Sequence, residues 1–465
     1  MTFGDFDDHS LSWTADGKEI VFVSDRSGHG DLFVRNDLWA VSVESGKVRQ
    51  ITATAGAAYR PSCSPDGACI AYLSTTRSNT SNDSVAEDSH VWVVPTKGGQ
   101  PVDLVEELDR PCTSIAWSPD GREVFFTVVD SGRRFLHSVS SQGGEVKTVM
   151  CGDWQISRKE PITLSSNGRI AFIREDPVHA PEVFVSSVDG TNVERITHFN
   201  DEFIRSHSFA KPEPFWFINE DGMDVQGWLA KPIGYEHEKK YPTVLCVHGG
   251  PHNLFGYSFD ERLQILASAG YAVVMVNPRG SIGYGQRFSD GCVYNWGGGD
   301  YRDIMEGLAN TIDSNEFIDD DRLFVTGGSY GGYMTNLIIT QTNRFKAAVS
   351  RACVSNLLSF YGTWTVFSLI EQEFPGLPYD NLSLLAQWSP ISHVGKVRTP
   401  TLFLHGEVDY TCPIGQAEEM FRGLKRMGVY TLLVRYQGEG HSMRKPGNKV
   451  YFYERHLYWF SKYLE

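Results

Sequence analysis

The 465-residue sequence contains no run of 18 or more apolar residues, so it predicts no membrane-spanning helix. Residues 1–8 also lack the basic cluster and the apolar stretch that together form a secretory signal peptide. Positive charge is in deficit, because 42 Lys and Arg face 57 Asp and Glu and the formal net charge is −15. Such a charge disfavours binding to phosphate-rich surfaces, so we expect neither a nucleic-acid nor a membrane partner. The first two absences predict a cytoplasmic protein.

Cysteine is scarce and scattered, and no Cys-x-x-Cys pair occurs. The eight cysteines lie at positions 63, 69, 112, 151, 246, 292, 353 and 412. This spacing predicts free, mostly buried thiols and argues against a disulfide framework or a structural zinc site. We expect neither a metal ion nor an organic cofactor.

What the sequence does contain is a nucleophile motif. Residues 327–332 read Gly-Gly-Ser-Tyr-Gly-Gly, which places Ser329 in a G-x-S-x-G pattern. The apolar run 323–326 predicts a strand before the serine, and residues 332–339 predict a helix after it. In this order the serine occupies a sharp strand-to-helix turn, and the glycines allow strand and helix to approach each other there.

Two later strands end in loops that carry candidate partners for Ser329. The apolar run 401–404 leads to Asp409, and the run 431–436 leads to His441. Catalytic groups of open parallel sheets gather at the carboxyl ends of the strands, and the order Ser, Asp, His is that of α/β-hydrolases. The predicted roles are a nucleophile for Ser329, a general base for His441, and a carboxylate that orients the imidazole for Asp409.

Each partner of the serine has a competitor. Glu407 competes with Asp409 as the acid, and we favour Asp409 because it lies deeper in the loop after the strand. His405 and His393 compete with His441 as the base. We expect His405, at a strand end, to be a structural histidine hydrogen-bonded to the backbone.

The oxyanion hole can be placed in the same way. In α/β-hydrolases one donor is the backbone N–H of the residue after the nucleophile, here Tyr330, and the other comes from an earlier glycine-rich loop. The segment 247–251, Val-His-Gly-Gly-Pro, follows the apolar run 243–246 and predicts Gly250 as the second donor. One such donor contributes roughly 3 kcal/mol of transition-state stabilisation. His248 is expected to be structural.

Four motifs together resemble the prolyl oligopeptidase family of serine peptidases, with the acylaminoacyl-peptidase-like branch most similar. They are Gly-Gly-Ser-Tyr-Gly-Gly-Tyr at 327–333, His-Gly-Gly-Pro at 248–251, Asn-Pro-Arg-Gly-Ser-Ile-Gly-Tyr-Gly at 277–285 and Asp-Tyr-Thr-Cys-Pro at 409–413. The resemblance covers about residues 211–465 closely and the preceding part by architecture. It implies a catalytic α/β-hydrolase domain that follows an N-terminal β-propeller.

Residues 1–210 contain a repeat built around an Asp-Gly or Asn-Gly pair. The copies lie at 11–22, 61–72 and 115–126, with a weaker one at 164–172. Such a pair between β-rich runs predicts a hairpin, and its recurrence every 47 to 54 residues predicts propeller blades of about four strands. Members of the resembled family usually carry seven or eight blades, so we expect an incomplete propeller that lacks its first blades, with a true four-bladed propeller as the alternative. Unpaired strand edges could then pair with a second copy and give a homo-oligomer.

The expected organisation is a partial all-β propeller over residues 1–210 followed by a catalytic α/β-hydrolase domain over residues 211–465. Lys211-Pro212-Glu213-Pro214 marks the boundary, because the repeats stop there. Expected elements are catalytic-domain helices near 260–269, 300–311 and 414–427, and an exposed inter-strand loop over the polar segment 78–89.

The resemblance also suggests a substrate pocket. In the acylaminoacyl-peptidase-like branch a short apolar helix lines it, and the matching stretch is 366–372. Val366, Leu369 and Ile370 are therefore pocket candidates, although their spacing fits an ordinary core-facing helix equally well. Thr411 stands where many relatives carry a basic residue, so a substrate-binding arginine is not expected there.

The functional hypothesis is a serine exo- or oligopeptidase that cleaves short peptides, N-acylated ones included, through an acyl-enzyme. A carboxylesterase acting on small acyl esters is one alternative, because the same groups serve both reactions. Dipeptidyl-peptidase specificity is another. The remaining alternative is a non-catalytic propeller scaffold, against which the intact set of candidate residues argues.

Overall fold

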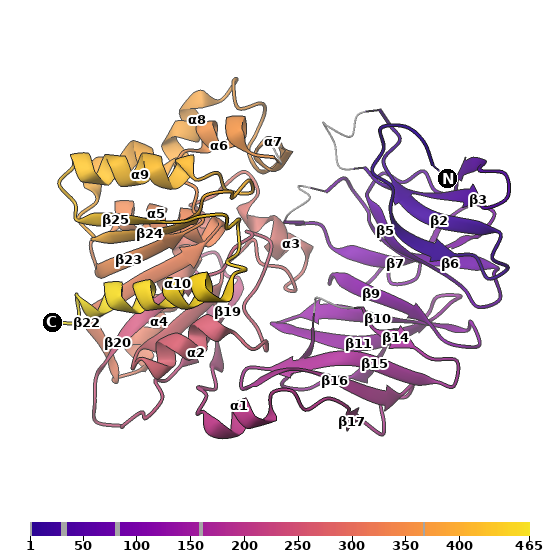
Figure 1. Cartoon of the computed structure of the whole chain (residues 1–465), viewed down its shortest axis with the longest axis horizontal. Coiled ribbons are helices and arrows are strands. Elements are labelled where there is room, and N and C mark those ends of the chain that lie inside the picture. The colour runs from indigo at the N-terminus through magenta and orange to yellow at the C-terminus, as the bar shows by residue number, and fades with distance from the viewer. Residues whose placement is uncertain (1, 29–34, 80–83, 158–160, 366–367) are drawn as a thin grey trace. The chain divides into compact units, whose positions relative to one another are not determined.

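The computed structural model describes residues 2–28, 35–79, 84–157, 161–365 and 368–465. The chain forms two compact units (Figure 1). Unit 1 contains residues 1–207 together with the short segments Gly256–Phe259 and Ile282–Ser289. Unit 2 contains the remainder: Ser208–Phe255, Asp260–Ser281 and Asp290–Glu465.

Unit 1 is built from four antiparallel sheets, one for each sequence repeat (Figure 1). The first contains β1 (His9–Trp13), β2 (Glu19–Ser24), β3 (Asp37–Ser42) and β4 (Val48–Gln50). The second contains β5 (Ala58–Cys63), β6 (Cys69–Thr75), β7 (Ser89–Pro95) and β8 (Val102–Asp103). The third contains β9 (Cys112–Trp117), β10 (Glu123–Asp130), β11 (Arg133–Ser140) and β12 (Lys147–Met150). The fourth contains β13 (Gln155–Ile156), β14 (Thr163–Leu164), β15 (Arg169–Asp176), β16 (His179–Ser187) and β17 (Glu194–Arg195), and α1 (Asp201–Ser206) follows it.

The repeated Asp-Gly pair forms the same turn in each of the first three sheets. Gly17, Gly67 and Gly121 have φ values of +69°, +74° and +69°, a region that favours glycine. The preceding hydroxyl donates to the Asp carboxylate, for example from Ser64 to Asp66 at 2.6 Å. The repeat found in the sequence is therefore a recurrent hairpin of one geometry.

Neighbouring sheets of unit 1 share apolar cores, as propeller blades do. Val21 and Leu38 of the first sheet pack in one cluster with Ile70 and Tyr72 of the second. On β1 of the first sheet, in contrast, Leu11 is 69% and Trp13 58% exposed. The four sheets are separate and blade-like.

The expectation of an exposed loop over 78–89 is wrong for its second half. Residues 80–83 lie outside the described part of the chain, but Ser84, Glu87, Asp88 and Ser89 are buried. The backbone N–H of Asp88 donates to the Gln286 side chain at 2.8 Å, and the Ser89 hydroxyl donates to the Cys112 carbonyl at 2.5 Å. These hydrogen bonds allow a polar segment to be buried.

Unit 2 is organised around one eight-stranded sheet in the order β18-β19-β21-β20-β22-β23-β24-β25 (Figure 1). Its strands are β18 (Glu213–Ile218), β19 (Asp224–Ala230), β20 (Tyr241–Val247), β21 (Ala272–Asn277), β22 (Ile318–Gly328), β23 (Phe345–Arg351), β24 (Thr401–Gly406) and β25 (Thr431–Tyr436). The first two form an antiparallel hairpin, β19 also pairs antiparallel with β21, and from β21 to β25 in this order each strand is parallel to the next. All six residues of β21 and all six of β24 are buried, as in a parallel sheet covered on both faces.

Helices connect the parallel strands of unit 2, and a last helix follows β25. They are α2 (Glu261–Ser268), α4 (Gly299–Ser314), α5 (Tyr330–Gln341), α6 (Leu357–Thr363), α7 (Ser368–Glu373), α8 (Leu382–Trp388), α9 (Gly415–Arg426) and α10 (Pro446–Ser461). Two 3-10 helices, Asp290–Cys292 and Pro390–Lys396, complete the unit, and the short α3 (Gln286–Ser289) falls in unit 1. The three expected helices correspond to α2, α4 and α9. No described helix is long and apolar enough to cross a membrane.

Candidate active site

Ser329 lies at the junction between β22 and α5, where the G-x-S-x-G motif predicts a sharp turn. Its φ of +61° is unusual for a residue with a side chain and marks local backbone strain. The backbone N–H of Ser329 donates to the Arg351 carbonyl of the neighbouring β23 at 3.2 Å. Strained strand-to-helix serines of this kind are typical of nucleophile elbows.

The glycines around Ser329 are required by close backbone packing. A Cβ atom built on Gly331 would lie 2.7 Å from the His248 carbonyl oxygen, and one on Gly327 would lie 2.8 Å from Gly331 Cα. Real Cβ atoms essentially never approach other atoms so closely. The first turn of α5 therefore packs directly against the loop after β20.

Asp409 and His441 are brought together by the loops that follow β24 and β25. His441 Nδ1 donates to Asp409 Oδ2 at 2.9 Å. The other carboxylate oxygen accepts from the backbone N–H groups of Thr411 and Cys412 at 3.0 and 2.8 Å, and Asp409 is only 3% exposed. A proton held on Nδ1 leaves Nε2 of the neutral ring as a proton acceptor.

The competing residues have other hydrogen-bond partners, and His405 Nε2 also lies 3.5 Å from Asp409 Oδ2. The Glu407 carboxylate pairs with Arg435 at 3.0 Å. His405 Nε2 donates to the Cys412 carbonyl at 2.7 Å, the backbone hydrogen bond expected of a structural histidine, and burial lowers its pKa. His393 Nε2 donates to the Gln387 carbonyl at 2.7 Å. The geometry thus favours Asp409 and His441 as the pair that serves Ser329.

The Ser329 hydroxyl lies 3.9 Å from the thiol sulfur of Cys412. Within the described residues it makes no direct hydrogen bond to His441, and catalytic hydrogen bonds are often long before substrate binds. The sequence motif at 409–413 includes Cys412, but nothing in its pattern predicted contact with the serine. The structure adds this buried thiol to the immediate surroundings of the nucleophile.

The glycine loop after β20 lies beside the serine. A Cβ atom built on Gly249 would be 3.4 Å from Ser329 Cβ and 4.0 Å from its Oγ. Gly250 has a φ of +122°, a conformation that disfavours side chains. The two predicted oxyanion donors, Gly250 and Tyr330, thus belong to segments that flank Ser329.

His248 supports this loop as a neutral ring. Its Nδ1 lies 2.7 Å from the Gly249 carbonyl, which can only accept, so the proton must be on Nδ1. Its Nε2 lies 3.0 Å from the Ser281 hydroxyl oxygen, and that hydroxyl also donates to the Pro278 carbonyl at 2.7 Å. Burial lowers the pKa of His248 to about 4. This agrees with a structural role.

Two of the three pocket candidates are buried. Leu369 and Ile370 lie on α7 and are 3% and 0% exposed, which agrees with a helix that packs this face against the core. Val366 lies outside the described residues.

One buried group has a composition suited to a metal ion. Candidate ligand atoms of His252, Cys292 and Glu373 all lie within 4.8 Å of one another. His252 Nδ1 donates to the Gly280 carbonyl at 2.8 Å, its Nε2 lies 2.7 Å from Glu373, and Trp296 Nε1 donates to the same carboxylate at 3.0 Å. These hydrogen bonds account for the imidazole and carboxylate without an ion.

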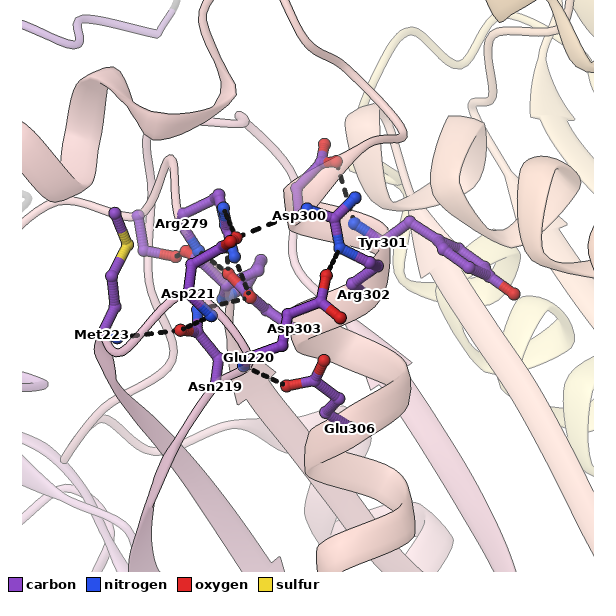
Figure 2. Close-up of polar contacts among 12 residues, drawn as sticks. Asn219, Glu220, Asp221, Met223, Arg279, Asp300, Tyr301, Arg302, Asp303 and Glu306 are labelled. Carbon is purple, nitrogen blue, oxygen red and sulfur yellow. Dashed lines mark hydrogen bonds and ion pairs between the residues drawn. The ribbon is translucent and has the colours of Figure 1, made fainter.

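A second buried network joins α4 to the segment after β21 (Figure 2). The Asp303 carboxylate accepts from the Arg279 side chain at 2.8 and 2.9 Å and from the Arg279 backbone N–H at 2.8 Å. Asn219 Nδ2 donates to the same carboxylate at 2.8 Å, and Arg279 also pairs with Asp221 at 2.7 Å. Asp300 lies one turn earlier on the helix (Figure 2). Sequence reasoning missed both aspartates, because their partners are distant in the chain.

Comparison with known proteins agrees with this architecture. Residues 257–465 match the prolyl oligopeptidase family. The chain is 36% identical over 352 residues to the uncharacterized peptidase YuxL of Bacillus subtilis, covering 75% of this chain and 53% of that protein. It is 26% identical over 436 residues to dipeptidyl-peptidase 5 of Schizosaccharomyces pombe, covering 92% of this chain and 62% of that protein. The chain thus spans a little more than half of the length of these relatives.

The fold is shared with solved structures. The structure of an acylaminoacyl peptidase from Pyrococcus horikoshii superposes with a TM-score of 0.85 at 23% identity, covering 99% of this chain and 71% of that one. A puromycin-hydrolyzing peptidase of Mycobacterium tuberculosis superposes with a TM-score of 0.73 at 20% identity, covering 99% of this chain and 79% of that one. At these identities the likeness concerns the fold. The match to the prolyl oligopeptidase family itself lies in residues 257–465, and the shared fold agrees with it.

Proposed function

We propose that this protein is a serine peptidase that hydrolyses short peptides through an acyl-enzyme formed on Ser329. The observation that carries the proposal is the 2.9 Å hydrogen bond between Asp409 and His441, on loops that follow neighbouring parallel strands of the sheet that bears Ser329. Catalytic groups of such sheets gather at the carboxyl ends of the strands. We assign residues 1–210 to the propeller part and residues 211–465 to the catalytic part.

In the proposed reaction His441 Nε2 accepts the Ser329 proton while Oγ attacks the carbonyl carbon of the scissile bond. Asp409 keeps the Nδ1 proton in place and stabilises the imidazolium that forms. His441 then donates its proton to the leaving amine, and the acyl group stays on Ser329. Water, activated by the same imidazole, releases the acid and regenerates the serine.

The second requirement of the reaction is that the negative charge on the oxygen of the tetrahedral intermediate be stabilised. We assign its stabilisation to the backbone N–H groups of Tyr330 and Gly250, which flank Ser329. Each donor of this kind contributes roughly 3 kcal/mol in the transition state. The proposed pair therefore supplies a large share of the rate enhancement.

The substrate class is narrowed by relatives named as acylaminoacyl peptidases and dipeptidyl-peptidases. We propose short peptides, N-acylated ones included, with Leu369 and Ile370 as candidate pocket residues. The test compares hydrolysis of N-acetyl-aminoacyl p-nitroanilides, free-amino dipeptidyl p-nitroanilides and p-nitrophenyl esters by the wild type and by Ser329→Ala.

We expect turnover of at least one peptide substrate, reduced in Ser329→Ala by roughly 10⁴-fold or more. The two p-nitroanilide series then decide between an acylated and a free substrate N-terminus. Turnover of esters without any turnover of peptides would replace the peptidase by a carboxylesterase. No turnover of any substrate by folded protein would favour a scaffold.

A further inference from the structure

Asp300 is a buried carboxylate at the start of α4 that contacts the residue after the proposed nucleophile. It is fully buried, and its Oδ2 accepts a short hydrogen bond from the Tyr330 hydroxyl. The same oxygen accepts from the backbone N–H of Gly297 at 3.0 Å, and Oδ1 accepts from that of Tyr301 at 2.8 Å. Three donors thus hold the carboxylate in one orientation.

The Tyr330 side chain is fixed on two sides. Its hydroxyl donates a hydrogen bond to Asp300. Its ring packs edge-on against the Trp296 ring, with the ring centroids 5.0 Å apart and the ring planes at 84°. Trp296 is itself held by its Nε1 hydrogen bond to Glu373 at 3.0 Å. Tyr330 is only 3% exposed. Its ring therefore has little freedom to change rotamer.

The peptide group between Ser329 and Tyr330 is held at its carbonyl, which accepts from the backbone N–H groups of Gly332 and Tyr333 at 2.8 and 2.9 Å. Its N–H is the first of α5 and, like other N–H groups of a first helical turn, has no acceptor within the helix. The preceding residue, Ser329, is strained at a φ of +61°. The contact with Asp300 adds a second anchor, through the Tyr330 side chain, to the peptide group that carries this N–H.

We propose that Asp300 is a positioning residue that anchors the Tyr330 phenol and thereby aims the Tyr330 backbone N–H at the oxyanion of the reaction. This inference rests on the proposed function. It concerns alignment of a donor, because Asp300 itself touches neither substrate nor the reacting atoms. A buried acid that does not belong to the Ser-Asp-His triad would thus affect the rate of the reaction.

Ionisation and rigidity support the role. Burial raises the pKa of Asp300 to about 6 and raises that of Tyr330 well above its ordinary value. At neutral pH the carboxylate therefore accepts while the phenol keeps its proton. One turn later on α4, Asp303 is bound to Arg279 and Asn219, so the helix that presents Asp300 is itself anchored (Figure 2).

The test is a double-mutant cycle on the active protein. Tyr330→Phe removes only the hydroxyl that meets Asp300, and Asp300→Asn replaces the charged acceptor by a neutral group of the same shape. We expect each variant to lower kcat about tenfold, less than the loss of a whole oxyanion donor, with KM changed less than twofold. The double variant should be no worse than the single ones, because both changes break one contact.

Two further measurements make the outcome decisive. Asp313→Asn, the same change at an exposed site near the end of α4, should leave kcat unchanged. The rate at which a fluorophosphonate labels Ser329 should fall with kcat in the Asp300 and Tyr330 variants, because the phosphonyl oxygen occupies the same donors.

If the wild type labels and turns over substrate while Tyr330→Phe matches it in kcat, the inference is wrong and the proposed function stands. Independent losses that multiply to about a hundredfold in the double variant would also overturn it. A wild type that neither labels nor hydrolyses would refute the proposed function, and the inference with it. If Asp300→Asn does not fold, Tyr330→Phe alone decides.

Discussion

At the scale of single residues, one hydrogen bond sets the tautomer of the proposed base. Asp409 accepts from His441 on one oxygen and from two backbone N–H groups on the other. The carboxylate therefore remains in place whichever substrate binds. The competing acid, Glu407, is paired with Arg435 on the surface. Asp409 and Glu407 lie only two positions apart in the sequence, but their different partners give them different roles.

Asp409→Asn should preserve the fold and remove most of the activity. The amide oxygen can keep the bonds to Thr411 and Cys412, so the amide N–H₂ faces His441 and donates to Nδ1. The ring proton then moves to Nε2, which can no longer accept from Ser329. We expect kcat to fall by roughly 10⁴-fold, as for the corresponding change in a serine protease. Glu407→Gln, measured with the same substrate, should retain wild-type kcat.

His456 makes the protein sensitive to acid. It is 1% exposed and lies between Phe452 and Phe460, and neither ring nitrogen has a hydrogen-bond partner within the described residues. Burial, with Arg262 and Arg351 nearby, lowers its pKa to about 3. The unfolded chain binds a proton below about pH 6.5 that the folded protein cannot bind, so stability is lost as pH falls from about 6.5 toward 3.

His456→Phe removes this loss and keeps an aromatic ring in the same site. Between pH 6.5 and 5 the wild type should lose about 2 kcal/mol of unfolding free energy through His456, and the variant should not. Denaturant unfolding at pH 8 and pH 5 measures the difference. His237→Phe, at an exposed position, is the control. Equal pH dependence of wild type and His456→Phe would show that this histidine is not the cause.

At the scale of elements, the approach of α5 to the loop after β20 determines where Ser329 lies. Gly331 permits this approach, since a side chain there would overlap the carbonyl oxygen of His248. The same loop also carries Gly250, the proposed second oxyanion donor. A change at one glycine of α5 therefore acts on nucleophile and donors together.

Gly331→Ala should both destabilise the protein and impair catalysis. The added methyl group must displace backbone, which costs about 3 kcal/mol, and a shift of the nucleophile by about 1 Å can lower the rate 10²-fold. Thermal unfolding and kcat check the two effects. Gly447→Ala, in α10 where a Cβ would meet nothing within 4 Å, should leave both nearly unchanged. Wild-type behaviour of Gly331→Ala would contradict the packing described for the elbow.

The elements also show what the sequence could and could not predict. Ser329, Asp409 and His441 each follow an apolar strand, and such local patterns are visible without a structure. Asp300 and Asp303 gave no such signal, because the side chains that bind them are distant in the sequence. Tyr330 lies 30 residues from Asp300, and Arg279 and Asn219 lie 24 and 84 residues from Asp303. The buried half of the segment 78–89 was missed for a similar reason, since its hydrogen bonds reach Cys112 and Gln286.

At the scale of the whole molecule, the two units are not simply consecutive in the chain. Gly256–Phe259 and Ile282–Ser289 group with unit 1, although the sequence on both sides of them belongs to unit 2. Within unit 1, Tyr257 N–H donates to the Gly132 carbonyl at 2.8 Å, and Ser131 N–H donates to the Gly283 carbonyl at 3.0 Å. Contacts of this kind could not be predicted from the repeat pattern, because they come from single residues of irregular segments.

Residues 211–465 expressed alone should therefore be less stable than the same residues in the full chain. The two segments would lose the packing and hydrogen bonds that unit 1 gives them. A loss of 2 kcal/mol corresponds to a fall in Tm of roughly 4–8 °C for a unit of this size. Calorimetry of both proteins measures it. An unchanged Tm would mean that these contacts contribute nothing to the stability of the catalytic part.

The central claim is that Ser329 is a nucleophile activated by His441 and Asp409. The most direct measurement is reaction of the intact protein with a fluorophosphonate, followed by mass spectrometric mapping of the modified residue. The account predicts one phosphonyl group per chain, attached to Ser329, abolished in Ser329→Ala and strongly slowed in Asp409→Asn. A folded wild-type protein that remains unlabelled, or that carries the label on another residue, would contradict it.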